Sequence, residues 1–272
     1  MRTIREIRSI VLALALCAAA ASGQSNGGGD SVYSRAEIPF SGGEVLTYEG
    51  KLSKIIRGLS VAELKLSVTD VPHSNDYLLT AEAKSKGTLL KLFRFSFLQL
   101  VASTVDGQSF RALKTTKHDV QKDRVRDSEA IFDYGQKRVT YIETDPKEPM
   151  RPPRKIASMI KDHTHDIISG IYALRMLPLA VGKSFDFWVS DSGLVYRIPV
   201  KVAARERLKT SIGTVWCYRL EPNVFGPDRF IEQEGSMLIW ITDDKKRIPV
   251  RAQINSSLGR VEVKLKSVKG RK

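Results

Sequence analysis

The sequence predicts a mainly β fold: a strongly curved antiparallel sheet, or an open or half barrel, with one helix packed against it. Most of the chain has apolar residues with a period of two, as in Ser60–Thr69, where Leu64, Leu66 and Val68 alternate with polar residues. A single stretch, about Asp166–Leu177, has its apolar residues at helical spacing. Many short strands around one helix favour a curved sheet that wraps the helix.

The expected strands are short and separated by turn residues. Asp106-Gly107 and Tyr134-Gly135 provide glycines that accept a positive φ between neighbouring strands. Before the helix, strands are expected at Val45–Leu52, Ser60–Thr69, Tyr77–Ala83, Phe95–Val105, Arg111–His118, Ser128–Tyr134 and Arg138–Glu143. After it, they are expected at Ser184–Val189, Leu194–Val202, Leu208–Arg219, Ser236–Thr242, Arg247–Ile254 and Arg260–Val268. Met237–Ile241 is apolar on both faces, which indicates a central, doubly covered strand.

A proline-rich segment divides the strands into two groups. Thr144–Pro153 contains prolines that cannot donate to a sheet ladder, so we expect an internal linker over residues 144–165. The helix follows, with Asp166 placed to cap its free N–H groups and Pro178 placed to end it. Because an all-β chain of this size can be one unit, residues 39–268 are predicted to form a single domain.

The N-terminal residues have the pattern of a secretory signal peptide. A basic head precedes the apolar run Ile10–Ala21, which is too short to span a bilayer core of ~30 Å. We expect a signal over residues 1–23 and a flexible, glycine-rich tether over 24–38. The predicted protein is exported, periplasmic or associated with the outer envelope, and soluble after cleavage. Cys17 leaves lipidation open, although Leu16 stands where a small residue is expected.

The chain is basic, with 44 Lys and Arg against 30 Asp and Glu and a net charge of +14. For an exported protein the available polyanions are head groups and wall polymers, so no nucleic acid partner is expected. One interpretation is a solvated surface, since the cations are spread over most strands. The other is weak contact with an anionic membrane through Lys264, Lys266 and the basic tail 269–272.

Two adjacent carboxylates, Asp243 and Asp244, lie between strongly apolar runs in LIWITDDKKRIPV. A tight hairpin explains them, because an Asp carboxylate in a turn accepts backbone N–H groups. The alternative is a hydrolase, which would need a second carboxylate across a cleft with an opposed pKa shift.

Other candidates for chemistry are few. His163 and His165 could hold a metal from an extended segment, or could belong to a polar loop that leads into the capped helix. Cys217, between Trp216 and Tyr218, has the surroundings of a buried small hydrophobe. Motifs for a nucleophilic serine, a phosphate loop, a dinucleotide or a zinc protease are missing from the sequence. No catalytic residue, metal or cofactor is therefore predicted.

The segment Leu89–Leu100 is unusually apolar and aromatic, with two cations inside it. One interpretation is the rim of an apolar cavity or a membrane-touching edge. Its ligand-binding residues would be Leu89, Leu92, Phe93, Phe95 and Phe97, and its contacts with an anionic surface would be Lys91 and Arg94. The other interpretation is a short turn followed by a core strand.

Several motifs together resemble a family of exported bacterial proteins catalogued as domain of unknown function 3108. They are Gly43-Glu44 with Tyr48, DIISGIYALR at 166–175, GTVWCYRL at 213–220, LIWITDDKKRIPV, and Gly259 before the last strand. The most specific parts are the Tyr-x-x-Arg helix and the Trp-x-x-Asp-Asp turn. The resemblance runs from about Gly43 to Leu265 and implies export and a mainly β fold, with no activity to transfer.

The leading functional hypothesis is a non-enzymatic envelope protein that binds a lipid or other hydrophobic ligand in an apolar groove. The alternative is a structural or interaction protein that binds a wall polymer or a protein through a basic face or a strand edge. A carboxylate-based hydrolase is the third. A filled core without a cavity would favour the second hypothesis over the first.

Overall fold

The computed structural model describes residues 38–53, 59–257 and 259–270, and in these the chain forms one continuous sheet of 15 strands. The first eight strands are β1 (Val45–Ser53), β2 (Leu59–Asp70), β3 (Tyr77–Ser85), β4 (Phe97–Val105), β5 (Ala112–Gln121), β6 (Arg124–Asp133), β7 (Arg138–Thr144) and β8 (Arg154–Met159). The others are β9 (Thr164–Asp166), β10 (Ser184–Asp191), β11 (Leu194–Thr210), β12 (Gly213–Pro222), β13 (Gly235–Thr242), β14 (Pro249–Ser256) and β15 (Gly259–Lys269). Helices α2 (Gly87–Phe93) and α3 (Ile167–Arg175) complete the described elements.

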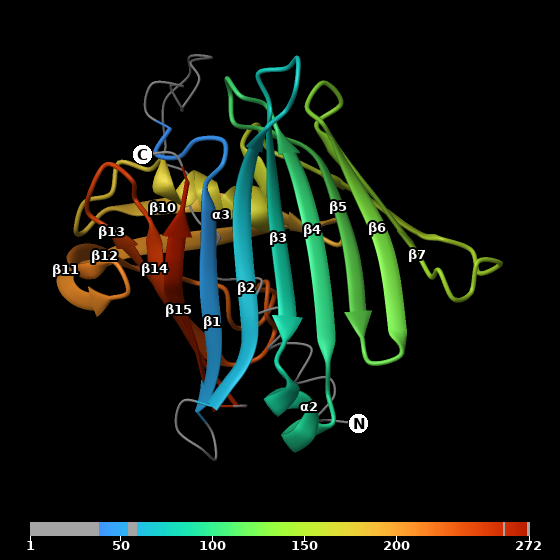
Figure 1. Ribbon diagram of the computed structural model, residues 1–272. Helices are drawn as coiled ribbons and strands as arrows, with labels where there is room; N and C mark the ends of the chain where they lie inside the picture. Colours follow the sequence, from blue (N-terminus) through green and yellow to red (C-terminus); the bar gives the residue numbers. More distant parts are fainter. Residues whose placement is uncertain (1–37, 54–58, 258, 271–272) are drawn as a thin grey trace.

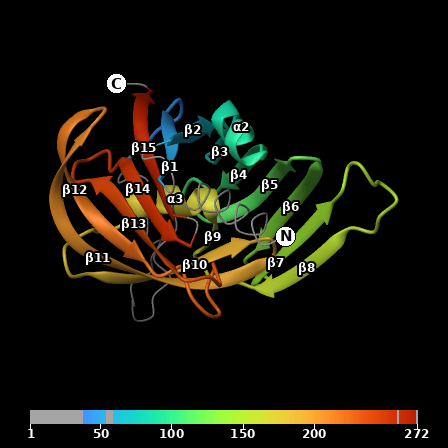
Figure 2. The same cartoon turned by 90° about the horizontal axis from the view of Figure 1, so that it is seen from below.

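The sheet curls around α3, as the sequence predicts. Its strand order is β8-β7-β6-β5-β4-β3-β2-β1-β15-β14-β13-β12-β11-β10-β9, antiparallel throughout except for the parallel β9–β10 pair. Figure 1 looks onto the outer face of β1–β7 with α3 behind it, and Figure 2 shows α3 inside the curve, with β6–β8 extending away to one side. The predicted fold class, a strongly curved and unclosed sheet around a helix, is confirmed.

The two ends of the sheet approach each other through side chains. The turn between β10 and β11 packs onto the inner face of β7 and β8, where Ser158 Oγ donates to the Gly193 carbonyl at 2.7 Å. Gly193 has φ +82°, and a Cβ there would lie 2.7 Å from the Cβ of Tyr141 and 2.8 Å from that of Ile156. Only glycine allows this close approach, because it has no Cβ and accepts positive φ.

Helix α3 is enclosed along its whole length, and all nine of its residues are buried. The Asp166 carboxylate accepts from the backbone N–H of Ile168 at 2.8 Å and of Ser169 at 3.1 Å. The Asp166 N–H in turn donates to Ser169 Oγ at 3.1 Å, which completes a capping box. The predicted cap is confirmed, although the helix ends at Arg175, two residues before Leu177.

The core follows the period-two pattern of the strands. In β1, buried and half-buried residues alternate along the strand, so Leu46, Tyr48 and Leu52 point inward. Strand β13 is instead buried on both faces near its end, as its two-sided apolar sequence indicates. A second, smaller cluster lies under β5–β7 and consists of Ala112, Phe132, Val139 and Ile160.

The structure differs from the sequence prediction at two segments. Residues 154–159, expected to be part of a linker, form β8 and pair with β7 from Arg138 to Glu143. The strand adds to the edge of the sheet after the prolines have ended, so proline does not interrupt its ladder. Residues 87–93 form α2 instead of a turn, because Leu89, Leu92 and Phe93 have the i, i+3, i+4 spacing of a one-sided helix.

Within the part of the chain that the structure describes, neither helix is long and apolar enough to cross a membrane. The predicted signal and most of the predicted tether fall on residues 1–37, which lie outside the described residues. Lys269, expected to begin the basic tail, is the last residue of β15.

Candidate functional site

Three of the motifs that support the family resemblance meet at Arg175. Its guanidinium is 1% exposed and donates to both oxygens of Glu44, at 2.5 and 2.9 Å. It also donates to the Lys246 carbonyl at 2.9 Å, in the turn after β13, and lies 5.0 Å from the Phe40 ring centroid. Helix α3, the residue that precedes β1 and the β13–β14 turn are therefore joined by one buried guanidinium. These motifs therefore position α3.

The carboxylate pair is a turn. Asp244 Oδ1 accepts from the backbone N–H of Lys246 at 2.9 Å and of Arg247 at 3.0 Å, which is the geometry of an Asx turn. Asp243 faces the other way and accepts from Arg205 Nε at 2.6 Å. Because the two carboxylates serve separate partners, the hairpin interpretation is confirmed and the pair offers no acid and base across a cleft.

The histidine pair does not form a metal site. His165 is 0% exposed, lies in β9 and stacks on Phe187 with ring centroids 5.1 Å apart. Burial lowers the pKa of its imidazole to about 3, so the ring is neutral at physiological pH. Among the described residues no three His, Cys, Asp or Glu side chains gather around a possible metal position. The loop expected here is replaced by a buried strand that leads directly into the cap.

Cys217 is buried in β12, as predicted. Burial raises the pKa of its thiol to about 12, so the reactive thiolate is scarce at neutral pH.

The apolar segment around α2 turns inward. Leu89, Phe95 and Phe97 are all buried in the main core, with exposed fractions of 3%, 1% and 4%. The side chains of Leu92 and Phe93 lie outside the described set. None of the three buried residues lines either of the cavities described below.

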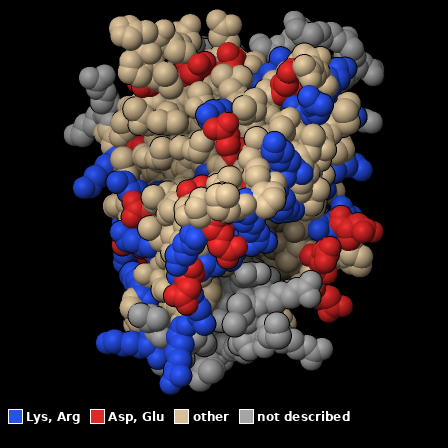
Figure 3. Space-filling model, turned by 90° about the vertical axis from the view of Figure 1, so that its right-hand side faces the viewer, with Lys and Arg blue, Asp and Glu red and all other residues tan. Residues whose placement is uncertain are grey.

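The four cations expected to contact an anionic surface are accessible. Lys91 and Arg94 are exposed at the end of α2. Lys264 pairs with Glu262 at 2.8 Å, and Lys266 lies 3.7 Å from Glu49. Figure 3 shows acidic residues interspersed among lysines and arginines on the side of the molecule that it faces. On that side the charge is that of a solvated surface and not a field of one sign.

A groove of about 660 Å³ runs across the outer face of β2–β7. Its lining comprises Lys65, Ser67, Thr80, Ala81, Glu82, Leu100, Val101, Ala102, Thr116, Lys117, His118, Asp127, Ser128, Glu129, Ile142 and Thr144. Six strands about 4.8 Å apart give it a length of about 24 Å. Figure 1 faces this side of the sheet.

The groove arises from the sheet register. Ser67, Thr80, Ala102 and Thr116 stand opposite one another on four successive strands, and these small side chains form a low row. The next row along the strands is taller and comprises Lys65, Glu82, Leu100, His118 and Asp127. The low row is therefore a trough across the strands with one raised border.

Two large apolar side chains remain exposed inside the groove. Leu100 is 40% exposed on β4 and Ile142 is 37% exposed on β7. Polar groups elsewhere in the lining are already paired, since His118 Nδ1 lies 2.5 Å from Asp127 Oδ1 and Ser67 Oγ lies 2.6 Å from Thr80 Oγ1. The groove thus offers free apolar surface within a frame of satisfied polar groups.

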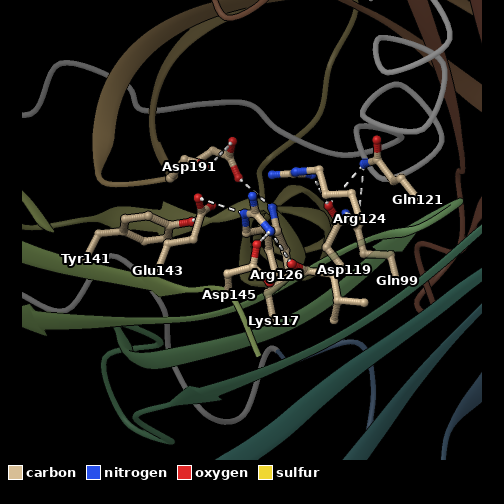
Figure 4. Close-up of polar contacts among 12 residues, drawn as sticks. Gln99, Lys117, Asp119, Gln121, Arg124, Arg126, Tyr141, Glu143, Asp145 and Asp191 are labelled. Atoms are coloured by element: carbon tan, nitrogen blue, oxygen red, sulfur yellow. Dashed lines mark hydrogen bonds and ion pairs between the residues drawn. The ribbon is translucent and has the colours of Figure 1, made fainter. Parts of the chain in front are cut away.

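The inner face of the same strands carries a network of charged residues (Figure 4). Asp119 accepts from Arg124 at 3.0 Å and from both Gln121 and Gln99. Arg126 pairs with Asp145, and Tyr141 OH donates to Glu143 at 2.9 Å. The residues point toward one another from β4, β5, β6 and β7, so the network stabilises the packing of these four strands.

Lys117 stands at the centre of this network, beside Asp191 of β10 at 3.4 Å. Burial by itself would lower the pKa of the Lys117 ammonium, but the nearby Asp191 carboxylate and further acidic groups raise it above its ordinary value. A pocket beside Lys117, between strands β4–β7 and the start of α3, has a volume of about 50 Å³. That is room for a water or two and not for a lipid.

Sequence comparison assigns the family. The sequence pattern described as "Protein of unknown function (DUF3108)" matches residues 46–266. The chain belongs to the DUF3108 family. The resemblance carried by the Arg175 and Asp244 motifs is thereby confirmed. No curated protein matches this DUF3108 chain in sequence.

One solved structure shares the fold. A crystal structure of a "beta-barrel-like protein of domain of unknown function DUF1849" from Brucella abortus matches with a TM-score of 0.56 at 9% identity, over 84% of this chain and 98% of that one. At this identity the likeness shows the fold alone. A Bacteroides fragilis "putative exported protein with YmcC-like fold" matches with a TM-score of 0.34 at 10% identity, over 85% and 98%. A "putative lipoprotein" from Parabacteroides distasonis matches with a TM-score of 0.32 at 11% identity, over 88% and 100%.

Proposed function

We propose that this DUF3108 protein is an exported, non-enzymatic envelope protein that binds a hydrophobic or amphipathic ligand in the outer groove of β2–β7. The observation that carries the proposal is the pair of exposed apolar side chains, Leu100 and Ile142, inside a groove of about 660 Å³. Pockets for small ligands are typically ~300–1,000 Å³ and largely apolar. Export rests on the signal-like pattern of residues 1–23.

The filled interior of the curved sheet has no room for a lipid, so the proposed ligand site lies on the outer face. The inner volume is occupied by α3 and its core partners, and the pocket beside Lys117 holds about 50 Å³. A single acyl chain fits the long outer groove better than it fits the small inner pocket. Lys65 at the β2 end supplies a cation for an acidic head group.

The test is binding of palmitate and of a lysophospholipid to the purified protein, measured by titration calorimetry. Leu100→Asn with Ile142→Asn should weaken binding at least tenfold, because it removes the two large exposed apolar side chains of the groove. Ile131→Asn is the matched control: Ile131 is 49% exposed on the same face but outside the groove lining, so its binding should equal that of the wild type. Equal loss in the control, or no uptake of either probe, contradicts the proposal.

A protein or wall-polymer partner is the second candidate, and the open edge of the sheet favours it. Strand β8 pairs with β7 on one side only among the described strands, so its other edge can accept an added strand. Cross-linking from a cysteine at Lys155, an exposed position on β8, to an envelope protein or wall fragment would support this function.

A further inference from the structure

The β11–β12 hairpin continues beyond the core and carries cations and an aromatic residue on one face. From residue 203 to the end of β11 no residue is fully buried. The register places Arg205 opposite Tyr218 and Arg207 opposite Trp216, with Lys209 next along the same face. In Figures 1 and 2 this hairpin lies at the left of the molecule, away from the groove of β2–β7.

The turn between β13 and β14 extends the same surface. The Asp243 N–H donates to the Trp216 carbonyl at 2.8 Å, which fixes the turn beside the hairpin. The turn brings Lys245 and Lys246, both exposed, and Arg247, which lies 5.3 Å from the Tyr218 ring centroid. We define the cationic hairpin surface as Arg205, Arg207, Lys209, Ile212, Trp216, Lys245, Lys246 and Arg247.

The charge of this surface is one-sided. It holds six cations, and two carboxylates, Asp243 and Asp244, lie in its turn, which leaves a surplus of four positive charges. Glu206, between Arg205 and Arg207 in the sequence, is bound by Trp240 Nε1 and Arg219 instead. Asp243 is bound by Arg205 and Asp244 is used inside its own turn. Among the described residues, Arg207 and Lys209 have no carboxylate partner. These cations remain available to an anionic partner.

Apolar side chains occur within the same surface. Trp216 is 44% exposed and has the Arg205 guanidinium 4.3 Å from its ring centroid. Ile212, in the turn at the tip of the hairpin, is 37% exposed. An indole flanked by arginines with an isoleucine at the tip suits the boundary between head groups and acyl chains, where one end is apolar and the other is wet.

We infer that the cationic hairpin surface docks this protein on an anionic phospholipid bilayer. Phosphate groups of the lipids pair with Arg207, Lys209 and the turn lysines, while Trp216 and Ile212 enter the interface. A soluble polyanion would satisfy the cations but would leave the exposed isoleucine and indole in water. The surface is separate from the groove of β2–β7, so the inference does not depend on the proposed ligand.

Vesicle cosedimentation of the purified protein tests this inference. Binding should be absent with phosphatidylcholine vesicles, present when about a quarter of the lipid is phosphatidylglycerol, and lost at high salt, because head-group attraction is screened. Arg207→Gln with Lys209→Gln should weaken binding roughly 25-fold, since each charge near the surface contributes roughly fivefold. The matched control, Lys137→Gln with Lys201→Gln, removes two exposed charges elsewhere and should bind as the wild type does.

A second variant distinguishes insertion of the apolar side chains into the bilayer from electrostatic attraction to its head groups. Ile212→Ser with Trp216→Ser should also reduce vesicle binding while circular dichroism shows an unchanged melting curve, because both side chains are exposed. Binding to phosphatidylcholine alone, or equal loss in the Lys137 and Lys201 control, would overturn the inference. Unchanged vesicle binding in either hairpin variant would do the same. Retention on dextran sulfate without vesicle binding would assign the surface to a soluble polyanion instead.

Discussion

Replacement of Arg175 by methionine should destabilise the protein more than any surface change. The guanidinium is 1% exposed and makes four hydrogen bonds, two to Glu44 and one each to the carbonyls of Pro39 and Lys246. Methionine fills much of the volume but leaves the Glu44 carboxylate, 8% exposed, without its counterion. Breaking a buried pair in this way costs about 3–5 kcal/mol.

The effect is measurable by thermal and urea unfolding. For a domain of this size, about 2–4 °C of melting temperature are lost per kcal/mol, so the variant should melt roughly 6–20 °C below the wild type. Arg197→Met is the control: Arg197 pairs with Asp186 at the surface, where an ion pair contributes ~1 kcal/mol or less. The double variant Arg175→Met with Glu44→Gln should recover part of the loss. A melting temperature within the range of the control would refute the structural role of the pair.

Three further predictions concern stability and reactivity. Hydrogen bonds from Ser60 and Lys86 lower the pKa of Glu49 to about 2, so its contribution to stability should be full above pH 4.5 and be lost as the pH falls through 2. In urea unfolding, Glu49→Gln should therefore lose much more stability at pH 7 than at pH 2, and an equal loss at both would contradict this. Gly193→Ala should destabilise by more than about 1 kcal/mol in the same assay, because φ is positive and the Cβ would clash; wild-type stability would show that the turn shifts freely. Cys217 should resist iodoacetamide at pH 8 in the folded protein and react once it is unfolded, since burial raises its pKa to about 12, and rapid labelling of the folded protein would contradict the burial.

The sequence supports the fold further than the site. Period-two patterning within each strand and a single capped helix predict a curved sheet around α3, because both signals are local. Asp244 could likewise be assigned to a turn, since its partners lie two and three residues away. The role of Arg175 could not be read in this way, because its partner Glu44 is 131 residues distant.

The groove could not be predicted for a related reason. Its low row depends on the relative register of β2, β3, β4 and β5, and a slip of one residue in any pair moves those side chains to the other face. The apolar and aromatic composition of Leu89–Leu100 indicates a ligand-binding segment, yet Phe95 and Phe97 face the core. Leu100, in the same segment, is exposed in the outer groove, and only the pairing of the strands reveals that position.

The most direct test of the proposed function is native mass spectrometry of the protein purified under mild conditions from its own envelope. An added mass of one lipid-like molecule per chain is expected in the wild type and in Ile131→Asn, and it should be lost in Leu100→Asn with Ile142→Asn. A clean mass for the wild type, with no uptake of added envelope lipids, would contradict the account and leave the strand edge of β8 as the functional surface.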